Sequence, residues 1–398
     1  MQVNRIIHPA GHGAFFTERI KEDEQKDIIV VYDCGCRETD EMRLLKKEVS
    51  GFFSPGETID ILFISHFDSD HVNGLKLLLP YMTKDTKLVM PFSYEYLYIP
   101  ISSSVMMEMG NALNALHEEL GDICECWVKY SDGNPEGPQG ERVTDYRELK
   151  DGMIESGSRI GAVNSHSVPF RYKWIYVPFN LYDDKSYRDK FRSEVSKKMG
   201  VPVASLRPTD LDQKAIERLR NIYKSIGVHP IDTPNPKTNK ANGSKNINEN
   251  SLVVLSKSTT YTCELWSNTY CCIRTVPCCY RCYEDCSIDG CDGSCLYTGD
   301  SNFGSRPKVD MLRRKLHDYT DAPVNLFQLP HHGSRQYYCM SLLTDYDLFV
   351  SMFVNCGEYD FRQGSFPKLL EDATIARRNA TLVTGKKICR VEQNIYMR

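Results

Sequence analysis

Short apolar runs, each closed by polar or turn-forming residues, recur in both end regions of the chain. In the first hundred residues they occupy 28–32, 59–64 and 88–90. Similar runs follow later, at 173–177, 252–255, 324–329, 348–354, 381–384 and 388–391. Runs of this length are typical of strands buried on both faces. The pattern therefore predicts buried strands in both end regions and one at 173–177 between them. A further strand is expected to run into Tyr297 and pair with 252–255.

Apolar residues at helical spacing indicate several helices. One is expected to begin near Asp70 and reach Leu79, and others to occupy 105–120, 211–226 and 309–316. Lys and Arg dominate 185–198, where we expect a solvated helix face. Residues 234–248 are polar and rich in helix breakers, which predicts a mobile surface loop that proteases can cut.

Composition narrows the class of protein. With 398 residues, 41% of them hydrophobic, the chain can build a substantial core in one large domain or in two of ordinary size. Its formal net charge of −4 provides no overall basic field for nucleic acid. The first residues lack the apolar core of a signal peptide, and no run approaches the roughly 18 apolar residues of a membrane span. We expect a soluble, cytoplasmic protein without membrane contact.

The strongest chemical signal is the heptapeptide at 65–71, which reads Ser-His-Phe-Asp-Ser-Asp-His directly after an apolar run. It offers four candidate metal ligands, namely His66, Asp68, Asp70 and His71. Imidazole and carboxylate are ligands of Zn²⁺, Mn²⁺ and Fe. One loop cannot complete two coordination shells, but Tyr297–Asp300 and Pro330–Ser334 each follow another strand-like run. The three segments together indicate a metal-dependent hydrolase.

Cysteine forms a second cluster. Nine of the 16 Cys residues fall between Cys263 and Cys295. In a reducing cytosol, clustered Cys bind metal more often than they form disulfides. A small structural zinc knuckle in this segment would draw on Cys279, Cys282, Cys286, Cys291 and Cys295. Free buried thiols, or redox-sensitive ones, are the alternatives.

These motifs resemble the metallo-β-lactamase superfamily, and within it the ComEC-like branch of DNA-uptake proteins. The resemblance rests on the 65–71 loop, on Leu-Tyr-Thr-Gly-Asp ending at Asp300 and on His-His-Gly-Ser at 331–334. It implies a mixed α/β (α+β) fold, a four-layer αββα sandwich, with one domain over 1–398. Residues 100–250 would be a poorly matched middle insertion, and 263–295 a Cys-rich insertion into a hairpin.

The resemblance also implies a two-metal site. Site one would use His66, Asp68 and Asp300, and site two Asp70, His71 and Asp300, with one of His331 and His332. We take His332 as the ligand. Asp300 would bridge the ions, which are expected to be Zn²⁺. Asp68 replaces the usual second His, so Mn²⁺ or Mg²⁺ is an alternative.

A metal-activated hydroxide would then attack the substrate. Asp70 would orient the water, and His331, when not a ligand, would donate to charge developing on the substrate. His12 lies between two glycines and is a third candidate catalytic residue, because it could reach the same metal site. The alternative is a local structural role in its turn.

Nucleic acid is the substrate and partner that the resemblance favours, which makes the protein a nuclease or phosphodiesterase. We also entertain an antiphage defence nuclease, held inactive until a protease or regulatory protein acts on the loop at 234–248. The alternatives are a small-molecule hydrolase, such as a phosphocholine esterase, lactonase or thioesterase, and a metal-stabilised binding module.

Overall fold

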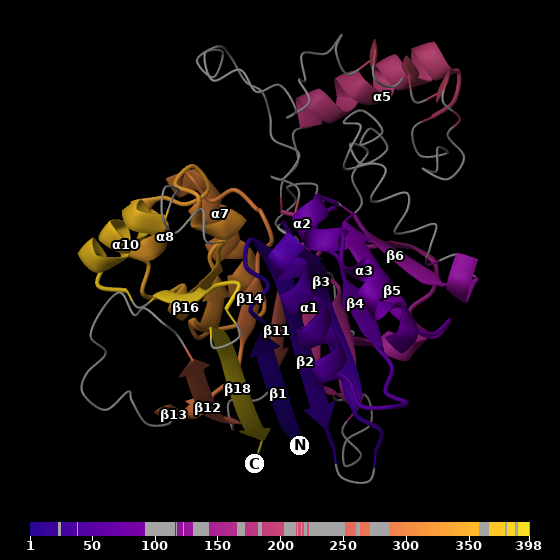
Figure 1. Ribbon diagram of the computed structural model, residues 1–398. Coiled ribbons are helices and arrows are strands. Elements are labelled where there is room, and N and C mark those ends of the chain that lie inside the picture. The colour runs from indigo at the N-terminus through magenta and orange to yellow at the C-terminus, as the bar shows by residue number, and fades with distance from the viewer. Residues whose placement is uncertain are drawn as a thin grey trace.

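The computed structural model contains two large β-sheets packed face to face (Figure 1). It describes residues 1–91 (without 23–24 and 38), 116–129 (without 117 and 122), 143–164, 172–181, 185–202, parts of 212–222, 251–259, 263–270, 286–357 and 366–397 (without 379 and 387–388). Among these residues, no helix has the length and apolar character needed to cross a bilayer.

The first sheet has ten strands. In spatial order they are β13 (Cys286–Cys291), β12 (Cys263–Tyr270), β18 (Arg390–Met397), β1 (Gln2–Ile7), β2 (Gly13–Lys21), β3 (Ile28–Cys36), β4 (Ile61–Phe63), β5 (Lys87–Pro91), β6 (Cys124–Val128) and β8 (Gly152–Ile154). The strands from β3 to β8 are parallel, whereas β1, β2 and β3 pair antiparallel. The start of β2 therefore lies at the same sheet edge as the end of β3.

The second sheet has eight strands. They are β17 (Ala380–Val383), β16 (Phe349–Asn355), β15 (Val324–Gln328), β14 (Cys295–Tyr297), β11 (Val253–Ser258), β10 (Tyr172–Phe179), β9 (Arg159–Asn164) and β7 (Val143–Asp145). β14 to β17 run parallel, and β14 pairs antiparallel with β11 through Val254 and Tyr297. The predicted pairing of 252–255 with the strand into Tyr297 is therefore confirmed.

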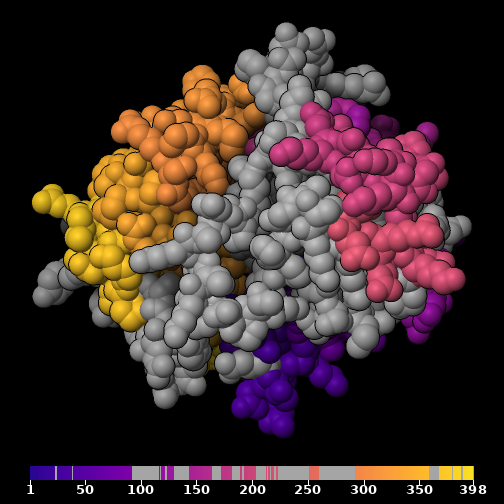
Figure 2. Space-filling model, turned by 90° about the horizontal axis from the view of Figure 1, so that it is seen from above, coloured from indigo at the N-terminus to yellow at the C-terminus, as the bar shows by residue number. Residues whose placement is uncertain are grey.

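Helices cover the outer face of each sheet (Figure 1). On the first sheet lie α1 (Thr39–Phe52), α2 (Ser69–Val72), α3 (Leu75–Leu78) and the 3₁₀ turn η1 (Leu79–Tyr81). On the second lie α7 (Arg306–His317), α8 (Met340–Leu343) and α10 (Phe366–Ile375). Helix α5 (Lys185–Met199) stands apart from these layers (Figure 1). Seen from above, α5 and α7 lie on opposite sides of the molecule (Figure 2).

Side-chain alternation along the strands separates the layers. Phe15 lies in the apolar layer that also contains Leu45 of α1, whereas the next residue, Phe16, lies between the sheets. On the second sheet, Val253 faces the helices and Val254 faces the other sheet. Both strands are thus buried on two faces. The apolar run at 252–255 predicts this for β11, whereas β2, which contains Thr17, Glu18 and Arg19, is not among the predicted runs. The expected αββα sandwich is confirmed.

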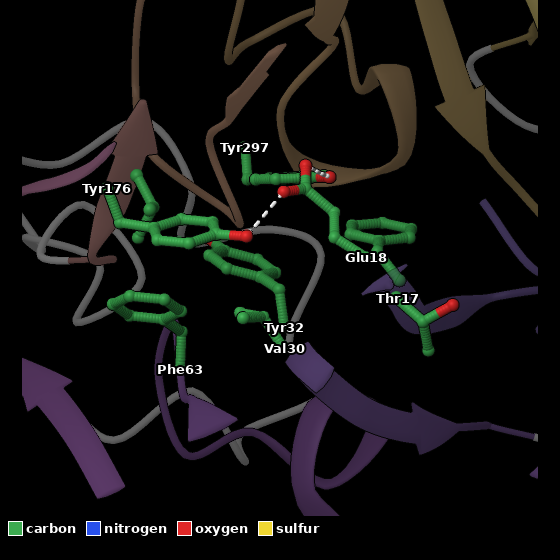
Figure 3. Close-up of a pocket in the computed structure, with 9 residues that line it drawn as sticks. Thr17, Glu18, Val30, Tyr32, Phe63, Tyr176 and Tyr297 are labelled. Atoms are coloured by element: carbon green, nitrogen blue, oxygen red, sulfur yellow. Dashed lines mark hydrogen bonds between the residues drawn. The ribbon is translucent and has the colours of Figure 1, made fainter. Parts of the chain in front are cut away.

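A buried ion pair lies in the core between the sheets. Arg5 Nε donates to Glu18 Oε1 at 2.6 Å. Tyr297 also donates to Oε1, at 2.8 Å, and Oε2 accepts hydrogen bonds from Tyr176 at 2.6 Å and Ser256 at 2.7 Å. Figure 3 shows Tyr176 and Tyr297 pointing toward the Glu18 carboxylate beside a small cavity. Burial alone would raise the pKa of Glu18, but the charge of Arg5 and the hydrogen bonds from Tyr176 and Ser256 lower it. The carboxylate is therefore held ionised inside the core.

Two segments differ from the sequence prediction. The helix expected from Asp70 to Leu79 is broken between α2 and α3 at Asn73 and Gly74. The Cys-rich segment does not simply interrupt a hairpin of the second sheet, because β12 and β13 cross over and extend the first sheet beside β18. Most of the helices expected at 105–120 and 211–226, and the whole loop at 234–248, lie outside the described residues.

Candidate metal centre

The candidate ligands converge because several strands end at one edge of the sandwich. The 65–71 loop follows β4, Asp300 follows β14, and His331 and His332 follow β15 within the short turn η7 (His331–Gly333). Two hydrogen bonds join the sheets at this edge, from Leu252 N to Ser65 O at 2.7 Å and from the Tyr32 hydroxyl to Leu252 O at 2.6 Å. Segments far apart in sequence thereby face each other.

A first group contains His66, His71 and Asp300, each buried, with ligand atoms within 4.8 Å of one another. His66 Nε2 lies 3.5 Å from Asp300 Oδ2, and His71 Nε2 lies 3.4 Å from Asp300 Oδ1. Both imidazole atoms are buried and have no hydrogen-bond partner among the described residues. Such atoms cost free energy unless something else satisfies them, and a metal ion between them would do so.

A second group contains His12, Asp70 and His332, whose ligand atoms also lie within 4.8 Å of one another. Asp70 Oδ2 is 3.1 Å from His332 Nε2 and 3.5 Å from His12 Nε2. The two imidazole rings lie 4.0 Å apart between centroids, tilted by 31°. One carboxylate and two imidazoles are a donor set suited to Zn²⁺ or Mn²⁺.

This grouping differs from the expected division of ligands, which stays a prediction. The resemblance pairs His71 with Asp70, whereas in the structure the Nε2 atom of His71 lies in the group of His66 and Asp300. The reason is local, because successive residues on helix α2 project about 100° apart and so face different groups. Both carboxylate oxygens of Asp300 face imidazoles of the first group. The second group does not include Asp300, and the expected bridging of two ions by Asp300 stays a prediction.

Asp68 and His331 lie beside the two groups rather than in them. Asp68 Oδ2 is 3.7 Å from His66 Nε2, and its side chain is 30% exposed. His331 Nδ1 is 2.5 Å from Asp300 Oδ2, and its ring stacks on Tyr337 at 3.9 Å. His331 and His332 both have left-handed backbone angles, with φ of 48° and 52°. Such strained positions cluster at functional sites, where surrounding structure must hold them.

A second set of contacts fixes the tautomers of the ligand histidines. Ser65 Oγ donates to Asp33 Oδ2 at 2.6 Å, so His66 Nδ1 donates to Ser65 Oγ at 2.9 Å. His71 Nδ1 donates to Asp33 Oδ2 at 2.8 Å. His332 Nδ1 donates to the carbonyl of Asn355 at 3.1 Å. In each ring Nε2 is left facing the site, as metal-binding imidazoles require.

Charge in the centre is balanced between acids and imidazoles. Burial alone would lower the pKa of His71, but Asp300 and Asp33 raise it well above its usual value. Burial alone would raise the pKa of Asp70, but the hydrogen bond from His332 and the charge of His71 lower it. Asp68 differs, since burial raises its pKa more than the charge of His66 lowers it. In the metal-free protein, protonated imidazoles thus supply the positive charge that balances the carboxylates. A bound divalent cation would supply that charge instead, so these residues fit a divalent metal.

Two glycines allow the backbone of Asp70 to approach the sheet. A Cβ on Gly35 would lie 2.5 Å from the Asp70 carbonyl carbon, and one on Gly13 would lie 2.8 Å from its oxygen. Real Cβ atoms do not come this close. The position of Asp70 therefore depends on glycine at both places.

The predicted zinc knuckle is only partly within the described residues. Cys279 and Cys282 lie outside them, and Cys286 and Cys291 are the two ends of β13. Cys295 lies in β14 and is fully buried between the sheets, where burial raises the pKa of its thiol to about 12. Zinc deprotonates a coordinating thiol, so the raised pKa does not decide the question, and the place of Cys295 in the knuckle stays a prediction.

No family model matches the sequence, and neither does any curated protein. Among solved structures, zinc-bound PqqB from Methylobacterium extorquens is 9% identical, with 96% of this chain and 97% of that chain covered and a TM-score of 0.39. The metallo-β-lactamase MIM-1 from Novosphingobium pentaromativorans is 11% identical, with coverages of 93% and 90% and a TM-score of 0.29. Likeness this distant carries no conclusion about activity, which has to be argued from the residues of this chain.

Proposed function

We propose that the protein is a metal-dependent hydrolase that acts as a phosphodiesterase on nucleic acid. The observation that supports this most is the pair of ligand groups at one sheet edge. Asp70 and His71 are neighbours in sequence but belong to different groups, so the two groups adjoin. Adjacent ion positions suit the attacking and leaving oxygens of an in-line displacement at phosphorus.

When bound, divalent ions at these groups would lower the pKa of coordinated water and polarise the phosphoryl oxygens. The protein's own part is to hold the ligands still. Asp33, Ser65 and Asn355 orient three imidazoles through their Nδ1 atoms. Rigid ligand placement lets the site stabilise transition-state charge without reorganising.

His331 is the proposed donor to the substrate. Its side chain is 27% exposed, so a substrate can reach it, unlike the buried first group. Stacking on Tyr337 and the contact between Nδ1 and Asp300 fix the ring. We assign His331 Nε2 the hydrogen bond to a non-bridging or leaving-group oxygen of the substrate, where negative charge develops.

Helix α5 supports a polyanionic substrate. It lies on the same side of the molecule as α2, the helix that carries Asp70 (Figure 1). Lys190, Lys197 and Lys198 are exposed on α5. Glu194 neutralises part of this charge, with its carboxylate 3.1 Å from Lys198 Nζ. The remaining positive charge favours phosphate backbones over neutral lactones or thioesters.

Hydrolysis assays decide between substrate classes. Purified protein is incubated with plasmid DNA, RNA and bis-p-nitrophenyl phosphate in the presence of Mn²⁺ or Zn²⁺. We expect cleavage that Asp70→Ala and His71→Ala abolish. Asp40→Ala, at an exposed site on α1, should leave it unchanged. Inertness toward all three substrates despite bound metal would reject the phosphodiesterase, and a panel of lactones, thioesters and phosphocholine esters would follow.

We further propose that this hydrolase serves in bacterial antiphage defence and is kept inactive until the loop at 234–248 is cut or moved. The support is the breaker-rich composition of that loop, which favours protease access. Limited proteolysis followed by the plasmid assay tests the idea. Nicked protein should cleave faster than intact protein, whereas equal rates would rule out this form of control.

A further inference from the structure

Helix α1 carries two acidic side chains that are buried, Glu41 and Glu48, with exposed fractions of 6% and 5%. A buried carboxylate costs free energy unless its oxygens are paired. Glu48 faces the side chains of His8 and Arg390. Glu41 instead accepts hydrogen bonds from backbone, from His12 N at 3.0 Å and from Arg37 N at 3.2 Å. The two glutamates therefore have different surroundings on one helix.

The chain packs closely around the Glu41 carboxylate. Gly11 has a left-handed backbone, with φ of 68°, and a Cβ there would overlap the Glu41 side chain. A Cβ on Gly357 would lie 2.9 Å from His12 Cβ and 3.2 Å from Glu41 Oε1. On Gly385 it would lie 3.4 Å from Glu41 Cγ. Three loops thus approach one carboxylate at positions that have no side chain, and the His12 turn rests against it.

The turn that Glu41 supports delivers a candidate ligand. His12 precedes β2, and its Nε2 lies 3.5 Å from Asp70 Oδ2, the only carboxylate of the second ligand group. Its ring also lies against that of His332. A shift of the His12 backbone would move the imidazole away from both partners. The acceptor that holds this backbone in place is Glu41.

We propose that Glu41 is a positioning residue that seats His12 as the third protein ligand of the second metal group. This inference rests on the proposed metal-dependent function, since it assumes that both groups hold ions. It assigns Glu41 no contact with substrate or metal. Loss of its carboxylate should weaken the ion at His12, Asp70 and His332 and spare the ion at His66, His71 and Asp300.

Glu48 provides the matched control. It lies two helical turns from Glu41 and is equally buried, but its partners His8 and Arg390 belong to neither ligand group. Glu48→Ala removes a buried carboxylate from the same helix and should cost stability. It should leave the affinity for both ions unchanged. Any effect on metal that Glu41→Ala has and Glu48→Ala lacks is therefore not general destabilisation.

The test counts ions in metal-free full-length protein titrated with Zn²⁺, and with Co²⁺ followed by its absorption spectrum. Not counting zinc held by the Cys-rich segment, wild type and Glu48→Ala should bind two ions. His12→Ala and Glu41→Ala should keep one ion at wild-type affinity and bind the other about 10- to 100-fold more weakly. Glu41→Gln keeps one acceptor oxygen for the His12 amide and should fall between Glu41→Ala and wild type.

The outcomes separate this inference from the proposed function. Wild type that binds fewer than two ions overturns both. If wild type binds two ions and Glu41→Ala or Glu41→Gln also binds two ions at unchanged affinity, the inference about Glu41 is overturned and the proposed function is not. Equal weakening of both ions also overturns it, because it indicates a general structural effect. If Glu41→Ala fails to fold by circular dichroism, Glu41→Gln decides by the same criteria.

Discussion

Asp33 Oδ2 lies 2.8 Å from His71 Nδ1 and accepts a hydrogen bond from it. The same carboxylate accepts hydrogen bonds from the Ser65 amide at 2.7 Å and the Ser65 hydroxyl at 2.6 Å. Asp33 is fully buried and has a left-handed backbone, with φ of 55°. One side chain of β3 thus fixes both the loop that carries the ligands and the ring of His71.

Asp33→Asn should weaken metal binding about 10- to 100-fold while the fold is kept. Asp33 accepts three hydrogen bonds, from the Ser65 amide, the Ser65 hydroxyl and His71. Asparagine replaces one acceptor oxygen with an NH2 donor, so it cannot accept all three. Competition with a zinc indicator measures the affinity. Asp60→Asn is the control, since Asp60 accepts from Ile29 N at the opposite end of the parallel strands. Equal affinities for wild type and Asp33→Asn would contradict the orienting role of Asp33.

Metal binding should release protons and weaken as the pH falls. The carboxylates of Asp300 and Asp33 raise the pKa of His71 against the opposing effect of burial, and Asp70 does the same for His332. A raised pKa keeps His71 protonated in the metal-free protein at pH 7, so a ligated imidazole must first lose that proton. Calorimetric titration with Zn²⁺ in buffers of different ionisation enthalpy counts the protons. No release at pH 7 would contradict the assignment of His71 as a ligand.

Gly35→Ala should lower hydrolysis about 100-fold, because the new methyl group must displace the Asp70 backbone and a shift of about 1 Å has that effect. Steady-state rates on bis-p-nitrophenyl phosphate provide the measurement. Gly51→Ala is the control, since a Cβ added there, near the end of α1, would have nothing within 4 Å. Full activity in Gly35→Ala would show that the close approach does not position Asp70.

Glu18→Gln should destabilise the protein by about 3–5 kcal/mol at pH 7, because it leaves the buried Arg5 without its counter-charge. Arg5 and two hydroxyl donors lower the pKa of Glu18 below its usual value although burial opposes this. The stabilisation is therefore fully present above the ordinary Glu pKa of about 4.3 and is lost as the pH falls through the folded-state pKa. Urea unfolding at several pH values should show that the difference in the free energy of unfolding between wild type and Glu18→Gln becomes smaller in acid. A difference in unfolding free energy that stays constant with pH would contradict the proposed ion pair of Glu18 with Arg5.

The strands and the ligand motifs could be predicted from the sequence because their signals are local. Uninterrupted apolar runs predict strands with two buried faces, and polar ligand types directly after them indicate a site at strand ends. Helix α1 gives no such signal. Its buried face mixes Leu45 and Val49 with Glu41 and Glu48, so the apolar periodicity is interrupted. Glu41 is buried against the backbone of His12 and Arg37, and Glu48 against His8 and Arg390.

The division of ligands could not be predicted, since it depends on contacts between distant segments. His12 reaches Asp70 only because β2 pairs antiparallel with β3, which places the start of one beside the end of the other. Asp33 was within reach of sequence reasoning, because it follows the apolar run 28–32 as Ser65 follows 59–64. Neither Ser251 nor Asn355, which contact His66 and His332, stands in a motif that suggests this role.

The central claim is that two adjoining ligand groups each hold one divalent ion. Native mass spectrometry of zinc-loaded protein tests it directly, with wild type, His66→Ala, Asp70→Ala and the double variant. Not counting zinc held by the Cys-rich segment, which is the same in all four proteins, we predict two ions in wild type, one in each single variant and none in the double variant. Wild type without bound zinc, or single variants that keep both ions, would contradict it.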